Sequence, residues 1–410
     1  MAAGSRWSFR GGIVVHSREA LYQARLKRYL TAMRNEKPDM VPIRPFVAEF
    51  TAKYAGFTCQ DVTQDYRKAF EAVLRCVEDF DWDAVVGNMV YVFAGIPQAM
   101  NLSYYAFPGV ELPPDVGFQY LEPPEDRAFM RSEEYDLLIE DPTGYLFNVW
   151  FPRVSRDAVP VGAAVTFRNN LAYLKGGMAM LDYFTALGKQ NEALKAKGVV
   201  PAICGILKAP LDILADKLRG YYGLARDLME RPKKVQQACE ALMPHLYKVA
   251  LLSADPEKQL PVTMWMHRSC VPLISMEHFH NIYWPTTKPI LEELWKNGHQ
   301  VLMYAEGNWD AHLETFRELP PGSVIYHVDR GDLLRARRVL GDRFALSGGF
   351  PNDLLTFGTP EEVRAICRKI IQEVARDGGY IMDAGAIIQN DASVENVKAL
   401  TEATREYGQY

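Results

Sequence analysis

Short, nearly continuous apolar runs alternate along the chain with stretches in which apolar residues recur every three or four positions, most clearly after residue 198. Continuous apolar runs are typical of parallel strands buried on both faces, and the three-to-four spacing is typical of amphipathic helices. The pattern predicts eight strands, over 42–47, 84–89, 199–204, 261–267, 300–306, 323–328, 343–347 and 379–383. Eight strands with helices between them indicate an α/β fold of the (β/α)8 TIM-barrel type.

Capping residues predict where several helices begin. Thr359 is a predicted N-cap, with Pro360 at the first helical position and Glu362 at the third. Asp332 is predicted to cap a helix over 333–340. Ser275 is predicted to cap a helix that Pro285 interrupts, and a further helix is expected over 286–298.

The 410 residues are predicted to form one barrel domain, 1–410, with a helical extension over 1–40. The interval 90–198, between predicted strands 2 and 3, is too long for one β/α step. It holds a proline-rich piece and a long helical run over about 170–197. We expect this insertion to cover the barrel mouth, as a lid or as the surface of a homodimer.

Composition narrows the function classes. The chain is 48% apolar and 24% charged, as in ordinary globular proteins, and 46 basic against 51 acidic residues give a net charge of −5. Without a basic excess, no nucleic-acid partner is expected. No apolar run reaches the ~18 residues of a membrane span, and the apolar core at 13–15 is too short for a signal peptide. The six cysteines are scattered without a CxxC, so we expect a cytoplasmic protein with reduced thiols.

Polar residues follow the predicted strands, and in a β/α barrel the active site lies at the carboxyl ends of the strands. We therefore predict catalytic roles for one set of residues: His267, Glu306, Asp329, Arg330 and Asp383. A second set is predicted to bind a small-molecule substrate: Glu49, Asn88, Arg268, Tyr304 and Asn308. Cys204 and Gly348-Gly349 also lie at strand ends.

His267 and Glu306 are the sharpest candidates, because each closes an apolar run. His267 could be a metal ligand, a general acid or base, or a hydrogen-bonded histidine of the rim. Glu306 could be catalytic, metal-bound, or paired with Arg268 or Arg330, since an unpaired buried charge is costly. Cys270, three residues after His267, is either a further ligand or an ordinary buried thiol.

The other candidates also have structural alternatives. Asp329-Arg330 and Asp383 could orient a substrate or form salt bridges with each other or with neighbours. Tyr304 could contact substrate or belong to the core. A zinc ion held by His267, Glu306 and Cys270 would have three protein ligands and one open position, as catalytic zinc requires.

Several segments, in their order and spacing, resemble the uroporphyrinogen decarboxylase superfamily. Asn35-Glu36-Lys37-Pro38-Asp39-Met40-Val41-Pro42 is similar to the family's G-x-x-P-D-R-V-P motif before the first strand. The resemblance continues through most of the chain, in Gly298 to Asn308, Leu340-Gly341-Asp342-Arg343, Ser347-Gly348-Gly349, Gly358-Thr359-Pro360-Glu361-Glu362-Val363, Asp377-Gly378-Gly379-Tyr380-Ile381 and Glu395-Asn396-Val397. It implies a β/α barrel with one of two chemistries: decarboxylation of uroporphyrinogen without a cofactor, or methyl transfer to or from a corrinoid protein, often with zinc.

The sequence departs from both patterns. The decarboxylases carry Arg-Gln-Ala-Gly-Arg-Tyr after the first strand, where this chain has Pro45-Phe46-Val47-Ala48-Glu49-Phe50 with only Arg44 nearby. The zinc-dependent thiol methyltransferases carry His-x-Cys after the fifth strand and a later cysteine. Here the corresponding places read Met303-Tyr304-Ala305-Glu306-Gly307-Asn308 and Ala386.

We therefore expect a divergent, cobalamin-dependent methyltransferase that moves a methyl group between a small methoxy- or methylamine-type compound and a corrinoid. No Asp-x-His-x-x-Gly segment is apparent, so the corrinoid is expected on a partner protein. Two alternatives remain open. One is a decarboxylase or other lyase, in which Arg44, Arg268 or Arg330 holds a substrate carboxylate. The other is a non-catalytic binding protein on the same fold.

Overall fold

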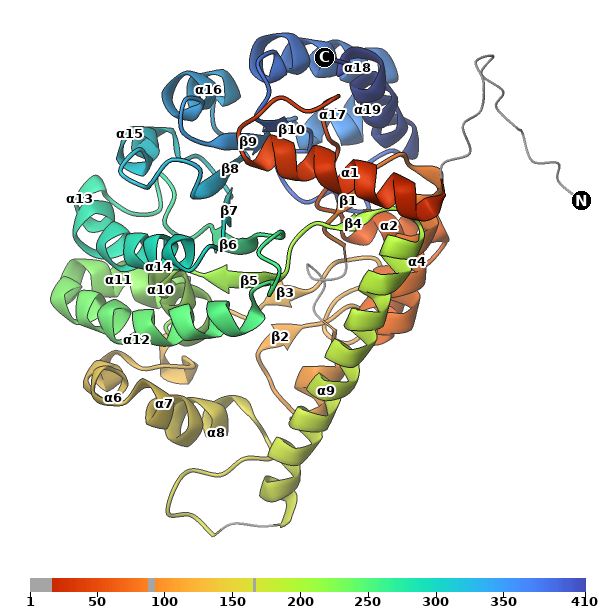
Figure 1. Cartoon of the computed structure of the whole chain (residues 1–410). Helices are drawn as coiled ribbons and strands as arrows, with labels where there is room; N and C mark the ends of the chain where they lie inside the picture. Colours follow the sequence, from red (N-terminus) through yellow and green to blue (C-terminus); the bar gives the residue numbers. More distant parts are fainter. Residues whose placement is uncertain (1–16, 88–92, 165–166) are drawn as a thin grey trace, which may run out of the picture.

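The fold is mixed α/β, built around a parallel sheet (Figure 1). The computed structural model describes residues 17–87, 93–164 and 167–410. Six parallel strands pair in the order β10-β9-β8-β7-β6-β5. Their bounds are β5 (Gly205–Lys208), β6 (Val262–Met266), β7 (Val301–Ala305), β8 (Val324–Val328), β9 (Ala345–Gly348) and β10 (Tyr380–Ile381). The prediction of an α/β protein with a parallel sheet is confirmed.

Further parallel pairing continues beyond this sheet. β1 (Ala84–Val85) pairs with β4 (Val200–Pro201). The segment 43–47 forms single parallel bridges on both sides, Ile43 to Met382 and Phe46 to Val86. The strand predicted over 42–47 is thus reduced to bridges, because Pro42 and Pro45 have no N–H to donate. The strand predicted over 199–204 is short at β4, and the chain resumes pairing only at β5.

Alternate residues of each strand enter two different cores. In β7, Val301 and Met303 join the large cluster that includes the outer helices, whereas Leu302 and Tyr304 face a smaller cluster on the opposite side of the strand. This alternation follows from the two-residue period of a strand. The smaller cluster also contains residues of α1 (Arg18–Met33).

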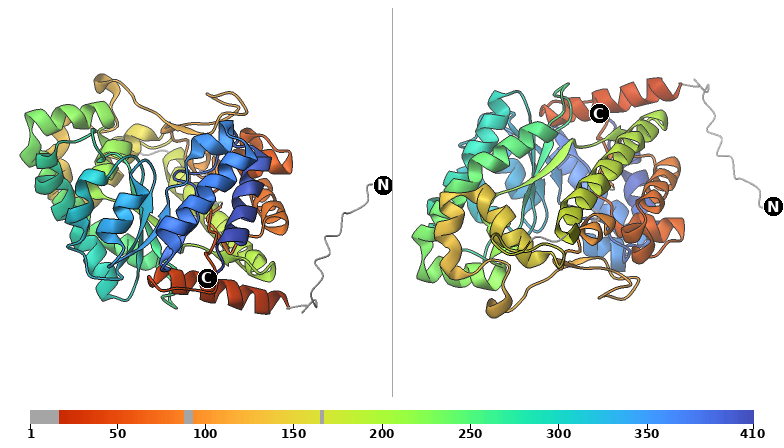
Figure 2. Two further views of the ribbon diagram at one scale, coloured as in Figure 1. Left: turned by 90° about the horizontal axis from the view of Figure 1, so that it is seen from above. Right: turned by 90° about the horizontal axis from the view of Figure 1, so that it is seen from below.

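Helices surround the strands (Figure 2). The longer ones are α4 (Tyr66–Asp79), α9 (Phe167–Ala196), α12 (Pro232–Ser253), α14 (Trp284–Lys296), α18 (Pro360–Ile370) and α19 (Val394–Tyr407). In the described ranges, no helix combines the length and apolar character needed to cross a bilayer.

Three predicted caps are confirmed and one predicted break is wrong. Thr359 forms a capping box at α18, and Asp332 caps α16 (Leu333–Leu340). Ser275 caps α13 (Met276–His278), but the chain continues through the π-helical turn η6 (Phe279–Tyr283) directly into α14. Pro285 does not interrupt this run. It is the second residue of α14, directly after the π-helical turn η6.

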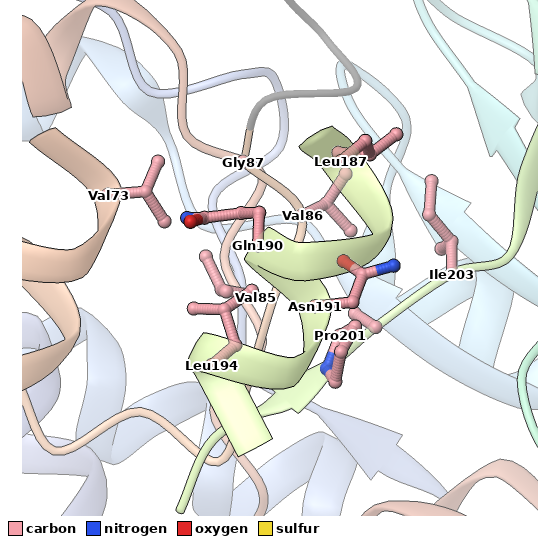
Figure 3. A pocket seen from close by; sticks show the side chains of 11 residues that line it. Val73, Val85, Val86, Gly87, Leu187, Gln190, Asn191, Leu194, Pro201 and Ile203 are labelled. Atoms are coloured by element: carbon pink, nitrogen blue, oxygen red, sulfur yellow. The ribbon is translucent and has the colours of Figure 1, made fainter. Parts of the chain in front are cut away.

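The helix expected over 170–197 is α9, whose second half packs against the body of the protein. A cavity of about 20 Å³ remains between α9, α4 and the strands β1 and β4 (Figure 3). It holds about one water molecule at most. Gln190 beside it donates to the Phe70 carbonyl at 3.2 Å. This cavity is a packing gap and too small for a substrate.

Candidate active site

A cleft of about 790 Å³ opens where strands β6 to β10 end. Its walls come from the segments that follow those strands, 267–273, 306–308, 329–331, 349–353 and 385–386. Small-molecule sites commonly occupy roughly 300–1,000 Å³, and ligands bind outside the carboxyl ends of parallel strands. Six residues predicted from the sequence line this cleft: His267, Cys270, Glu306, Asn308, Asp329 and Arg330.

His267 and Glu306 leave neighbouring strands at the same level. β6 and β7 pair in parallel up to Met266 and Ala305. One residue further, the Glu306 amide donates to the Met266 carbonyl at 2.9 Å. Both side chains line the cleft, so an imidazole and a carboxylate meet over one opening.

Asp216 holds the His267 ring. Nε2 of His267 lies 2.8 Å from Asp216 Oδ2 and 3.0 Å from Oδ1. Among the described residues, the other ring nitrogen, Nδ1, is buried and has no hydrogen-bond partner. When one ring nitrogen of a histidine is hydrogen-bonded to a carboxylate, the other ring nitrogen can exchange a proton with a substrate. The pair has the form of a general acid–base dyad.

Asp216 also binds two permanent cations. Its carboxylate accepts from Lys208 of β5 and, at 2.8 Å, from Nε of Arg268. The Asp216 side chain is fully buried. Burial alone would raise its pKa, but the hydrogen bonds and charges of His267 and Lys208 outweigh that effect and hold the pKa well below its usual range. Asp216 is therefore an anion under all ordinary conditions.

Sequence reasoning missed Asp216 because it ended the third strand too early. The predicted strand stops at 204, whereas pairing with β6 runs through β5 to Lys208. Asp216 follows this true strand end, in the π-helical turn η5 (Leu214–Leu218). A strand prediction extended over Ile206 and Leu207 would have brought Asp212 and Asp216 into the list of candidates.

Glu306 and Asp329 make one side of the cleft acidic. Glu306 Oε2 accepts from Trp265 Nε1 at 2.9 Å, and the ion pairs to Arg268 or Arg330 weighed from the sequence are not formed within 4 Å among the described residues. Asp329 Oδ2 accepts from the Gly307 amide at 2.7 Å. Burial raises the pKa of Asp329, and the nearby charge of Glu306 adds to this.

The net charge of the cleft walls is negative. Carboxylates of Glu306, Asp329 and Asp353 face a single guanidinium, Arg330. Within the part of the chain that the structure describes, Arg330 is exposed and has no ion pair. Such a cleft suits a neutral or cationic ligand with at most one anionic group, and it disfavours a molecule with many carboxylates.

Asp383 and Tyr304 lie in the interior and do not line the cleft. Asp383 is 1% exposed, accepts from the Phe46 amide at 3.2 Å and lies 3.5 Å from Nη2 of the fully buried Arg44. Burial raises the pKa of Asp383 to about 7, against the opposing charge of Arg44. The salt-bridge alternative for Asp383 is thus the one observed.

Tyr304 belongs to a column of three rings that crosses neighbouring strands. Its ring stacks on Trp265 with centroids 4.2 Å apart, and on His327 at 4.4 Å. Trp265 in turn holds Glu306. The core alternative for Tyr304 is the one observed, because strand alternation turns its side chain inward, into the smaller core.

Two further predicted substrate residues, Glu49 and Arg268, do not line the cleft. Glu49 is the first residue of α2 (Glu49–Ala55), where burial raises its pKa. Arg268 is engaged with Asp216 and lies 3.9 Å from Glu122. Asn88 falls outside the described residues.

The expected zinc ligands do not form a metal-binding group. Cys270 donates through Sγ to the His267 carbonyl at 3.3 Å, and burial raises the pKa of its thiol. In residues 17–87, 93–164 and 167–410, no three His, Cys, Asp or Glu side chains are arranged to hold a metal ion. Zinc bound by His267, Glu306 and Cys270 stays a prediction.

Lys217, next to Asp216 in η5, carries a charge that the protein only weakly stabilises. Its ammonium donates to the Tyr105 hydroxyl at 3.3 Å and lies 4.8 Å from the centroid of the Tyr104 ring. No carboxylate of the described chain lies within ion-pair distance of it. Burial lowers the pKa of Lys217 to about 8.

Lys217→Met is expected to raise the unfolding free energy at pH 7 by about 1–3 kcal/mol, because methionine removes a charge that burial disfavours. The folded pKa lies below the unfolded one, so the penalty is complete below about pH 8 and is relieved as the pH rises from about 8 to 10.5. Urea denaturation at pH 7 and pH 10 measures this. The exposed Lys233→Met is the matched control and should change little. A Lys217→Met variant less stable than wild type at pH 7 would contradict the argument.

Comparisons with known proteins relate this chain to a family. The sequence model described as "Uroporphyrinogen decarboxylase (URO-D)" matches residues 184–407. Uroporphyrinogen decarboxylase from Thioalkalivibrio sulfidiphilus is 23% identical over 394 residues, 93% of this chain and 97% of that protein. The enzyme of the same name from Chlorobium phaeovibrioides is 33% identical over 78 residues, which span 18% of this chain and only 22% of that protein.

A solved structure resembles most of the chain. The methyltransferase from Methanosarcina mazei superposes with a TM-score of 0.61 at 16% identity, over 93% of this chain and 98% of that one. At this identity, the likeness concerns the fold.

Proposed function

Because the chain belongs to the uroporphyrinogen decarboxylase family, we propose that it is an enzyme whose active site is the cleft at the ends of β6 to β10. We propose methyl transfer as its reaction, between a small methoxy- or methylamine-type substrate and a corrinoid carried by a partner protein. The observation that carries the proposal is the Asp216-held His267 beside Glu306 in a cleft with few cations. The fold shared with a protein named a methyltransferase supports it.

We also propose that the parallel segments close into a (β/α)8 TIM barrel that forms one domain over 1–410. The single bridges of segment 43–47 to Met382 and Val86, together with the β1–β4 pair, support closure on the side away from β7. In this arrangement the extension 1–40 adds the helix α1, and the insertion 90–198 contributes the antiparallel pair β2 (Tyr105–Ala106) and β3 (Gln119–Tyr120), whose Tyr120 lies next to Lys208 at the end of β5. The reduced state of all six cysteines supports a cytoplasmic location.

In the proposed reaction, His267 is the proton donor to the atom from which the methyl group departs. When the carbon–oxygen bond of a methoxy donor or the carbon–nitrogen bond of a neutral amine donor breaks, the leaving atom keeps the electron pair and takes a proton, whereas a cationic amine donor leaves as the neutral amine and needs none. His267 supplies that proton from Nδ1, while Nε2 stays hydrogen-bonded to Asp216. Glu306 and Asp329 attract the positive charge of an amine donor or accept hydrogen bonds from an alcohol or phenol product. The reduced corrinoid on its carrier supplies the nucleophile.

The test is methyl transfer to a reduced corrinoid protein, followed by the change in corrinoid absorbance, across a panel of methoxylated and methylated-amine donors. At least one donor is expected to give a time-dependent change that depends on this protein. The His267→Gln variant with the same donor is the matched control and should be much slower. Flat traces across the panel, with a carrier that accepts methyl groups from another enzyme, would refute the proposal.

A decarboxylase or other lyase is the second candidate, and the unpaired Arg330 favours it. A guanidinium in the cleft without an ion pair among the described residues can bind one substrate carboxylate. Release of carbon dioxide from a small monocarboxylate, lost in Arg330→Ala, would identify this reaction. It would leave the methyl-transfer assay without signal.

A further inference from the structure

A second cavity, of about 290 Å³, lies at the end of the sheet where the strands begin. Among its lining residues, Leu260 comes shortly before β6, Gln300 directly before β7 and Gly322 shortly before β8. Parallel strands begin at one face of the sheet and end at the other, and His267 follows the far end of β6. A substrate in the cleft therefore cannot occupy this cavity, and neither proposed reaction accounts for it.

Trp295, near the end of α14, supplies an aromatic wall to the cavity. Its indole is 36% exposed. The ring lies over the backbone of Gly322, because a Cβ added to that glycine would be 3.7 Å from Cη2 of Trp295. Leu30 of α1 and Leu260 line the same cavity. Together they offer an indole and aliphatic surface to a flat apolar group.

Two cations border the cavity. Arg34 and Lys258 are exposed, and neither forms an ion pair within 4 Å among the residues that the structure describes. Glu36 is the one carboxylate of the described lining. The lining thus carries one positive charge in excess, although the whole chain has a net charge of −5. A locally positive cavity on an acidic protein favours an anionic ligand.

The Lys258 ammonium is positioned by the backbone around it. The Lys258 amide closes a turn by donating to the Asp255 carbonyl at 2.9 Å, and the Asp255 carboxylate accepts from the next two amides, of Gln259 and Leu260. In this turn Lys258 has a φ of +57°, which disfavours a side chain. A Cβ added to Gly298 would lie 3.1 Å from the Lys258 Nζ. A side chain at position 298 would therefore displace the ammonium from the cavity.

We propose that this cavity binds an aromatic monocarboxylate, with its ring against Trp295 and its carboxylate between Arg34 and Lys258. Guanidinium and ammonium groups both hold carboxylates through charge-assisted hydrogen bonds. One positive charge in excess matches a monoanion, whereas Glu36 disfavours a ligand with a second negative charge. A volume of about 290 Å³ is close to the lower limit of small-molecule sites, which favours a compact ligand. The inference does not depend on the proposed reaction.

The first test is isothermal titration calorimetry of the full chain with naphthoate, and with naphthamide as the uncharged analogue. Wild type is expected to bind naphthoate and to bind naphthamide much more weakly. Arg34→Gln and Lys258→Gln should each weaken the binding of naphthoate by about tenfold or more, the usual effect of losing a hydrogen bond to a charged group. Arg330→Ala, in the cleft, is the matched control and should keep this site. The absence of naphthoate binding, equal affinity for naphthamide, or a loss of binding in Arg330→Ala alone overturns the proposal.

Fluorine NMR of the chain labelled with fluorotryptophan locates the ligand without changing any charge. The variants Trp295→Phe and Trp265→Phe identify two signals among those of the seven tryptophans. Naphthoate is expected to shift the Trp295 signal and to leave the signal of Trp265, the indole that holds Glu306, in place. A shift confined to Trp265 would place the ligand in the cleft and overturn the proposal. An equal shift of the Trp295 signal by inorganic phosphate would assign the cavity to anions in general and would overturn the aromatic ligand.

Discussion

Asp216→Ala is expected to lower the unfolding free energy by about 3–5 kcal/mol, because removing one partner of a buried ion pair leaves the other charges uncompensated. The substitution leaves Lys208 and the Nε2 hydrogen of His267 without their partner, and it leaves Arg268 with only Glu122, 3.9 Å away. No other carboxylate of the described chain lies within 4 Å of Lys208 to replace it. Urea denaturation at pH 7 measures the loss.

The dependence of the unfolding free energy on pH gives a second test of the role of Asp216. The folded pKa of Asp216 is depressed, so its stabilising contribution is complete above the unfolded pKa and is lost as the pH falls toward the folded one. The stability of Asp216→Ala should therefore fall less steeply than that of wild type in acid. Asp342→Ala, which removes an exposed pair with Arg317, is the control and should cost about 1 kcal/mol or less. An Asp216→Ala protein as stable as wild type would contradict this prediction, because it would show that Lys208 and Arg268 do not need the Asp216 carboxylate to balance their charge.

His267→Ala is expected to lower the rate of the proposed transfer by about 10²–10⁴-fold, the usual contribution of a general acid or base. Its effect on stability should be small, because Asp216 keeps Lys208 and Arg268 as partners. The measurement is the rate of corrinoid methylation under saturating donor, together with urea denaturation of the same variant.

Two controls separate chemistry from structure. His280→Ala removes an exposed imidazole on η6 and should leave the rate unchanged. Added imidazole should partly restore His267→Ala, as it does where a ring alone is missing, but should not restore Asp216→Ala. Full activity of His267→Ala would remove this residue from the reaction and favour a binding protein on the same fold.

The position of His267 and Glu306 could be predicted because both follow long apolar runs that are uninterrupted by proline or glycine. Their strands pair in simple register, so one residue past each strand both side chains reach the same opening. The strand end at Lys208 was harder to find. Gly205 and Lys208 divide the apolar pattern there, and only the pairing of β5 with β6 shows where the strand ends.

Other errors arose from contacts between residues far apart in the sequence. Asp383 follows a strand like Glu306 does, yet its partner is Arg44, some 340 residues earlier. No local pattern distinguishes a carboxylate that turns inward to a buried arginine from one that reaches the cleft. The prolines in segment 42–47 caused a different kind of error. They weaken the hydrogen bonding of the predicted strand, but the segment still lies between the segments that contain Met382 and Val86.

The stacked rings of Trp265, Tyr304 and His327 limit how the ligand selectivity of the cleft can change. Glu306 is tied to the indole, and each ring is held by the next. A new orientation of the carboxylate breaks its hydrogen bond to Trp265, and the indole cannot follow it because its ring is packed on Tyr304. New selectivity is therefore more easily acquired in the loop residues 271–273 and 349–351, which line the same opening and do not hold Glu306.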